Sequence, residues 1–520
     1  MNEKSKKYLI PIILFLVSST LYSINLDQQG IFIDEVFHHG FSIMYYDSLK
    51  NIDVLNPCIT GIGECTMIDL DCAGDVQWLA SGGIIKGIFV GLGDEWFSDS
   101  ERVYYANSGT CRPIHSDEII RGINTPTQDE LESGRFFSPI FGAMGVVVAF
   151  QIGLLLFNRF VGAIFAITLM SFSLYMLHGR ILTTEIFVSF FMLLSILLLL
   201  HAFLGKKDFQ LKYLIFSGIA FASALNSKII SIEVLPLMIL IICFGFSKEI
   251  SFSSIRKIFS KKIIGLITLF LVVTIISTIA TFPFYYADPV GQFFIQLEGS
   301  KTHGAWNSSI LEGNNFSFLP FVFTFSATVM PTIDSYYYLF DPENIPDSAQ
   351  LGHTFTTIPL SIFSFIGFCF IIQKIRKRNL QFSEFFLLAW YIPIFIISGL
   401  ITDSYNATRY FLPLMFPMML MMSYGLWRFI ENISSTNLKF YFVSLFIFTH
   451  GITYMIFWER IYLQPTIIWR LPYEINLRES LSEPIVYVSS IIFIISFFVI
   501  YFKNKNDNNS QITQKTKNPQ

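Results

Sequence analysis

The stretch YLIPIILFLVSSTLYSI runs from Tyr8 to Ile24, and IFIDEVFHHG follows from Ile31 to Gly40. The first stretch carries no charge and is long enough for a transmembrane helix. The second places Asp34 and Glu35 side by side just past the outer end of that helix, at the depth where headgroups meet water. A cleaved signal peptide is the alternative, but no small-residue cleavage site follows the apolar run. We therefore predict a retained helix with an acidic pair at the membrane surface.

The composition of the whole chain extends this prediction. Of 520 residues, 53% are hydrophobic and only 14% are charged, which is too apolar for an ordinary soluble domain. Lipid cannot hydrogen-bond the backbone, so each long apolar run must be a helix. We predict an all-α polytopic membrane protein of about twelve spans: 8–25, 136–157, 160–178, 183–204, 211–227, 229–246, 263–284, 354–373, 383–401, 410–430, 438–457 and 484–502. A shorter run, 316–333, contains two prolines and is predicted to lie on the surface or to be re-entrant.

Lys and Arg clusters set the orientation, because they accumulate on the cytoplasmic side of short loops. The clusters lie at 4–7, 206–212, 256–262, 374–378 and 503–505. Twelve crossings put all of them, and both termini, inside. The predicted membrane domain is 1–502, followed by a disordered cytoplasmic tail, 503–520. The membrane is the plasma membrane in a prokaryote or the endoplasmic reticulum in a eukaryote.

The loop 27–135 then lies outside, with 18 acidic and six basic residues. Apolar spacing predicts amphipathic surface helices at 37–49 and 76–92. Further external regions are 285–353 and 458–484. The loop holds four of the six cysteines, and on an oxidising side they predict two disulfides of open connectivity: Cys58, Cys65, Cys72 and Cys111. Their spacing does not fit structural zinc. Metal dependence stays open.

Asp34 and Glu35 are the first candidate for chemistry. Neighbouring carboxylates repel, so one can stay ionised as a base while the other takes a partner. A solvated loop pair is the ordinary alternative, although the flanking residues are apolar. On a helix beginning near Asp34, His38 stands one turn further along, within reach of a hydrogen bond or a phosphate.

Four more constellations fall on the predicted outer side. Arg180 and Glu185 flank one turn, where a local ion pair is the alternative reading. Lys228 is an external cation suited to a phosphate, or it extends to the headgroups. Arg409 and Tyr410 can also bind phosphate, or anchor the chain in the aromatic belt. His303, beside Trp306, is a candidate contact for sugar or lipid, or part of ordinary loop structure.

In their order and shared side, these motifs resemble the GT-C glycosyltransferases. The likeness is to the protein O-mannosyltransferase and aminoarabinose transferase branch, the dolichyl-phosphate-mannose-protein mannosyltransferase family, over roughly 1–429. The resemblance implies transfer of a sugar from a polyprenyl-phosphate donor, as lipid-linked co-substrate, to a protein, lipid or glycan hydroxyl on the external face, with inversion. The long first loop with its cysteines departs from the family pattern.

The resemblance also implies residue roles. Asp34 would be the general base, and Glu35 would help to place the acceptor or the turn. Lys228 and Arg409, beside Tyr410, would hold the phosphate. Glu185, oriented by Arg180, would line the sugar or assist the base. His38 and His303 are further substrate contacts. We expect membrane lipids, but no nucleic acid, among the other partners.

Two other classes remain. A secondary transporter or flippase-like protein for an anionic or lipid-linked solute also fits twelve helices, but we see no internal repeat, and the ionisable groups cluster at the outer boundary. The second is a non-catalytic membrane protein that keeps this architecture. Only an activity measurement distinguishes it from a glycosyltransferase.

Overall fold

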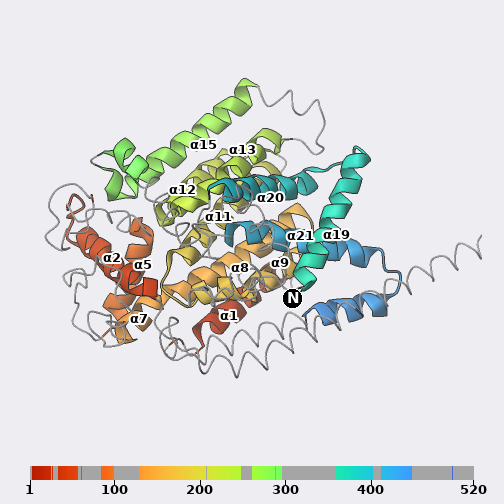
Figure 1. Ribbon diagram of the computed structural model, residues 1–520, viewed down its shortest axis with the longest axis horizontal. Helices are drawn as coiled ribbons and strands as arrows, with labels where there is room; N and C mark the ends of the chain where they lie inside the picture. The colour runs from red at the N-terminus through yellow and green to blue at the C-terminus, as the bar shows by residue number, and fades with distance from the viewer. Residues whose placement is uncertain are drawn as a thin grey trace, which may run out of the picture.

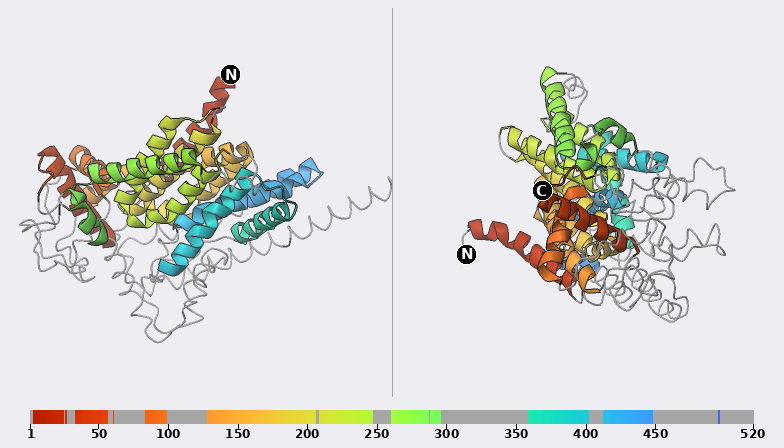
Figure 2. Two further views of the ribbon diagram at one scale, coloured as in Figure 1. Left: turned by 90° about the horizontal axis from the view of Figure 1, so that it is seen from above. Right: turned by 90° about the vertical axis from the view of Figure 1, so that its left-hand side faces the viewer.

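The computed structural model describes residues 3–24, 26, 33–56, 60, 83–98, 128–205, 208–246, 260–286, 288–295, 358–401, 412–447 and 495. Within these ranges the elements are all helical, as predicted. The long helices form a bundle, and a smaller helical layer lies at one end of it (Figures 1 and 2).

The bundle follows the predicted apolar runs closely. Its helices are α1 (Glu3–Ser23), α8 (Phe137–Leu156), α9 (Arg159–Met170), α10 (Ser173–His178), α11 (Thr184–Leu204), α12 (Leu211–Ser227), α13 (Leu235–Phe244), α15 (Lys261–Ala280), α19 (Ile358–Arg376), α20 (Phe382–Ile401) and α21 (Leu412–Glu431). A further apolar helix spans Thr436–Ile447.

Two predicted spans differ from the structure. The run 160–178 is broken at 171–172 into α9 and α10, and the Ser171 hydroxyl donates to the Ile167 carbonyl where α9 ends. The run 229–246 begins as a 3-10 helix, η4 (Ile229–Val234), before α13 with its early proline. Among the described residues, three helices are long and apolar enough to cross a membrane by length and composition: Asp129–Leu156, Thr184–Leu204 and Lys261–Ala280. The runs 316–333 and 484–502 lie outside the described residues, apart from residue 495.

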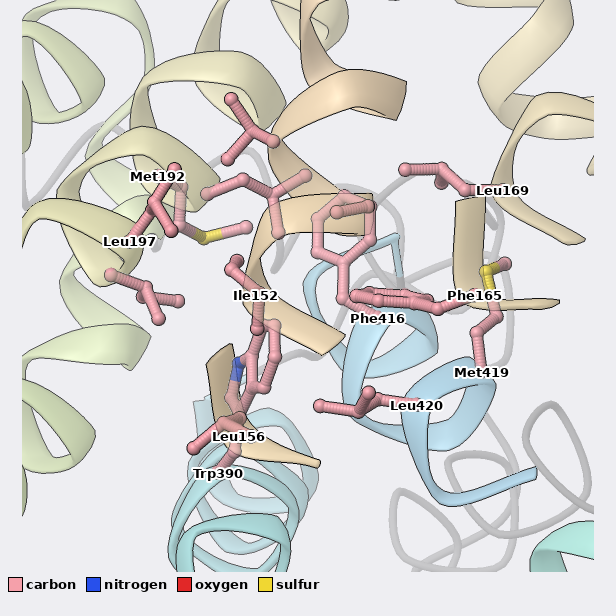
Figure 3. Packing of buried hydrophobic residues seen from close by; sticks show 14 of the residues in the cluster. Ile152, Leu156, Phe165, Leu169, Met192, Leu197, Trp390, Phe416, Met419 and Leu420 are labelled. Carbon is pink, nitrogen blue, oxygen red and sulfur yellow. The ribbon is translucent and has the colours of Figure 1, made fainter. Parts of the chain in front are cut away.

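Side chains from four helices meet in the core of the bundle. Trp390 of α20 is fully buried beside Leu156 of α8, and Phe165 of α9 lies near Phe416 of α21 (Figure 3). Lipid tails are as apolar as these side chains, so close van der Waals packing rather than exclusion from water holds such helices together.

Small and polar residues bring the helices into contact. Ser195 of α11 and Ser217 of α12 each donate a hydroxyl hydrogen bond to the other's carbonyl oxygen, both at 2.8 Å. A Cβ at Gly425 of α21 would lie 2.0 Å from the Phe363 carbonyl oxygen of α19. Only glycine permits that approach, as in other small-residue helix interfaces.

The end layer contains the described part of the first loop: α2 (Ile33–Lys50), α5 (Gly83–Phe97) and α7 (Gln128–Arg135). The structure has helices over 37–49 and over 83–92 of the predicted 76–92; residues 76–82 lie outside the described part of the chain. Gly87 and Gly91 of α5 face Tyr45 and Tyr46 of α2, and a Cβ at either glycine would lie under 3 Å from the opposing tyrosine Cβ. The two helix backbones therefore pack closely, and α2 buries one face against protein.

Candidate functional site

Glu35 anchors the beginning of α2 to two distant parts of the chain. Its side chain is fully buried, and its two carboxylate oxygens accept from Arg135 of α7, from Nε at 2.7 Å and from Nη2 at 2.5 Å. Oε1 also accepts from the backbone N–H of Leu182 at 2.6 Å. A bidentate pair with a third hydrogen bond fixes both position and orientation. The first turn of α2, which contains Asp34, is thereby held against the α10–α11 turn.

Arg180 binds the end of the first helix. Its Nη1 donates to the carbonyl oxygens of Tyr22 and Ile24, at 3.0 and 2.9 Å, and the side chain is 1% exposed. These are carbonyls that a helix C-terminus leaves without an intrahelical partner. Arg180 therefore joins α1 to the turn that also receives Glu35, rather than only pinning its own turn.

Glu185, at the start of α11, pairs with Lys228 at the end of α12. The Lys228 ammonium lies 2.6 Å from Oε1, and Oε2 accepts from Thr184 at 3.2 Å. His178 Nδ1 lies 2.8 Å from the Thr183 hydroxyl and 4.0 Å from Glu185 Oε2. We expected Arg180 to orient Glu185, which stays a prediction; Lys228 and Thr184 contact the Glu185 carboxylate. The Lys228 side chain keeps 20% exposure, so it still reaches the surface of this end.

The two histidines of α2 face α5. His38 Nδ1 lies 2.8 Å from the ammonium of Lys86, which is 1% exposed. His39 Nε2 lies 3.5 Å from an oxygen of Asp94, also buried. Consecutive turns of α2 thus place Glu35, His38 and His39 against charged partners within the end layer.

The start of the second external region is tied to the same layer. Tyr45 of α2 packs against Phe282, with ring centroids 6.0 Å apart, just before the 3-10 helix η5 (Pro283–Tyr285). Gln292 donates to the Thr60 carbonyl at 3.1 Å. Burial, and the neighbouring Tyr285 hydroxyl, raise the pKa of Tyr45, so its phenol stays neutral.

Of the predicted site residues, the structure brings Glu35, His38, Arg180, Glu185 and Lys228 to one end of the bundle. Asp34 lies within α2, but its side chain is outside the described part of the chain. His303, Arg409, Tyr410, Cys58, Cys65, Cys72 and Cys111 also lie outside the described residues. Among the described residues, no group of three His, Cys, Asp or Glu side chains could hold a metal ion.

Three charged residues of this layer were not predicted from the sequence: Lys86, Arg135 and Asp94. Arg135 and Asp94 follow no local pattern, because their partners on α2 are far away in the chain. Lys86 had a usable signal: it is a lone cation within the apolar run 84–90, and such a charge marks a buried contact or a site.

Residues 112–281 match the family model described as dolichyl-phosphate-mannose-protein mannosyltransferase. The match confirms, over this part of the chain, the resemblance that the motifs predicted. It includes Arg135, Arg180, Glu185 and Lys228. A resemblance to this family indicates a membrane glycosyltransferase.

Solved structures with a similar arrangement are found as well. ArnT from Cupriavidus metallidurans bound to undecaprenyl phosphate is 11% identical, with 94% of this chain and 75% of that chain covered and a TM-score of 0.45. The apo Archaeoglobus fulgidus oligosaccharyltransferase is 13% identical, with 92% and 58% covered and a TM-score of 0.47. No curated protein matches the chain.

Proposed function

We propose that the protein is an integral membrane glycosyltransferase that moves a sugar from a polyprenyl-phosphate donor to an acceptor hydroxyl on the external face, with inversion. One observation carries the proposal. The buried Glu35–Arg135 pair and the Leu182 hydrogen bond hold the first turn of α2, which contains Asp34, beside the α10–α11 turn. Glu185 follows that turn and pairs with Lys228 at the end of α12. The backbone at Asp34 and the side chains of Glu185 and Lys228, from three distant segments, therefore lie at one end of the bundle.

Asp34 is the proposed general base. An inverting displacement breaks the bond between the sugar's anomeric carbon and the carrier phosphate while the acceptor oxygen attacks, so the acceptor must lose a proton. A carboxylate at the beginning of α2 suits this role. Glu35 does not share it, because its oxygens already accept three hydrogen bonds. We assign Glu35 the task of placing the turn.

Lys228 is the proposed partner of the leaving phosphate. Negative charge grows on that phosphate as the sugar departs, and an ammonium fixed in place stabilises it. The ion pair with Glu185 keeps Lys228 oriented before the donor binds. Arg409 and Tyr410 complete the phosphate contacts in this proposal, and His303 contributes to the sugar side.

The test uses the full-length protein in lipid nanodiscs. It is incubated with radiolabelled polyprenyl-phosphate mannose, glucose or aminoarabinose, together with a membrane extract that supplies protein, lipid and glycan acceptors. We expect label from one donor to become covalently attached to an acceptor, in the anomeric configuration opposite to that of the donor. Asp34→Asn is the matched control preparation.

Two results would contradict the proposal. One is retention of the configuration in the product. The other is release of no label from any of the three donors by protein that binds the polyprenyl phosphate. Uptake of labelled donor into sealed proteoliposomes without transfer would favour the transporter class instead.

A further inference from the structure

Lys86 of α5 is buried where α5 packs closely against α2. Its neighbour Gly87 lies so near that a Cβ there would be 2.8 Å from the Tyr45 Cβ and 3.2 Å from the Ser42 carbonyl oxygen. The ammonium consequently reaches His38 Nδ1 at 2.8 Å, with 1% and 5% exposure for the two residues. A lysine is rarely buried this completely without a specific partner.

The chemistry of the contact fixes the histidine tautomer. We expect Lys86 to be charged; an ammonium has three donors and no acceptor, so Nδ1 then accepts and the ring hydrogen sits on Nε2. Lysine is also the stronger base of the two side-chain types, so the proton resides on the amine. A second positive charge on the imidazole, 2.8 Å away and out of water, is strongly disfavoured.

The contact between Lys86 and His38 lies close to the proposed base. His38 follows Asp34 by four residues on α2, so the two positions share a face of the helix. We infer that Lys86 is a positioning residue for the proposed transfer: it holds His38 neutral, with Nε2–H as a donor, one turn from Asp34. Without Lys86 the repulsion from its ammonium is lost, so the imidazole can become cationic one helical turn from the proposed base.

Other charged groups around α2 have their own contacts. On α5, Asp94 faces His39, and Glu95 binds Lys50 at the far end of α2. On α7, Arg135 is engaged by Glu35, and Glu130 is buried in the same helix. Lys86 contacts His38 directly, so its replacement changes the charge next to that ring.

The first experiment reads the histidine directly and needs no activity. The full-length protein with ¹⁵N-labelled histidine is studied by NMR from pH 5.5 to 8, and the His38 signal is assigned by its loss in His38→Gln. We expect a neutral ring with the hydrogen on Nε2 throughout. In Lys86→Met the same ring should titrate in this range. Lys86→Gln, which keeps a donor but no charge, should keep the Nε2–H tautomer at pH 8 and still titrate. A wild-type His38 that titrates, or carries its hydrogen on Nδ1, overturns the inference.

The second experiment rests on the proposed function. With an ordinary histidine pKa near 6.5, the neutral fraction at pH 5.5 is about one in ten, so transfer by Lys86→Met should fall roughly tenfold between pH 8 and pH 5.5 relative to wild type. The double variant Lys86→Met/His38→Gln should lose this acid-side fall. Lys50→Met, which removes an exposed lysine of the same layer, should keep the wild-type profile.

An equal loss for Lys86→Met at every pH, unchanged by His38→Gln, would mean that Lys86 only supports the fold, and would overturn the positioning role. If no donor supports transfer by the wild type, the proposed function fails, while the NMR result still decides whether Lys86 sets the state of His38.

Discussion

Asp34→Asn keeps the size and hydrogen-bonding shape of the side chain but removes the proposed base. Loss of a general base typically lowers the rate by about 10²–10⁴. We expect single-turnover transfer to fall by that factor while donor binding, measured by displacement of labelled polyprenyl phosphate, stays within about twofold. Transfer at a near wild-type rate by a folded, donor-binding Asp34→Asn variant would exclude Asp34 as the base and leave Glu185 as the candidate.

The Glu35–Arg135 pair allows a prediction about stability at the same scale. Either Glu35→Leu or Arg135→Met leaves one buried charge without its partner, which typically costs about 3–5 kcal/mol. The double variant removes both charges and should recover much of that loss. Thermal unfolding midpoints in one detergent give the comparison, with Lys50→Met as a control for an exposed ion pair.

Recovery of stability in the double variant should not restore transfer, because the turn with Asp34 would still lack the hydrogen bond from Leu182. A double variant as unstable as the sum of the two singles would mean that the two side chains act independently, contrary to the contact that joins them.

Between elements, the contact of α19 with α21 depends on the absence of a side chain. Gly425→Leu would drive a Cβ toward the Phe363 carbonyl, and overpacking of this kind costs about 1–3 kcal/mol or more. We expect a lower unfolding midpoint and poorer recovery from detergent. Gly265→Leu on α15 is the matched control, because a Cβ there meets nothing within 4 Å. Equal midpoints for the two variants would contradict the close packing.

Helix positions could be predicted from sequence far better than contacts. The bounds of α8, α11 and α12 agree with the apolar runs within a residue or two, because a long apolar segment in lipid has to satisfy its own backbone. The break at 171–172 and the 3-10 start at Ile229 were not predicted, since both lie inside continuous apolar sequence.

The candidate site was predictable only in part, for a related reason. Arg180, Glu185 and Lys228 stand out as charges at the predicted outer ends of apolar runs. Their actual partners do not stand out, because a contact such as Glu35 with Arg135 spans 100 positions and leaves no local pattern. Lys228 was predicted to be an isolated cation, and the structure pairs it with Glu185.

For the whole molecule, the topology predicted from the Lys and Arg clusters gives a labelling pattern. Single cysteines introduced at 50–130, 290–350 and 460–480 should react with a membrane-impermeant maleimide from outside, and those at 206–210, 250–262 and 374–379 only after permeabilisation. The parent carries Cys243→Ala and Cys369→Ser and keeps the loop cysteines, so its own signal is the baseline. External labelling next to Arg376 would contradict the topology and put Asp34 on the wrong side.

The contact of Arg180 with the end of α1 also fixes the order in which parts of the fold can form during synthesis. The Tyr22 carbonyl accepts a hydrogen bond from Arg180, which is 158 positions later in the chain. At synthesis rates of about 5–20 residues per second, roughly 8–30 s pass before that residue has even been made. During that interval the end of α1 lacks the hydrogen bond from Arg180, and Glu35 lacks the one from the Leu182 amide. We therefore expect the end of α1 and the first turn of α2 to reach their final positions only after the α10–α11 turn has been synthesised.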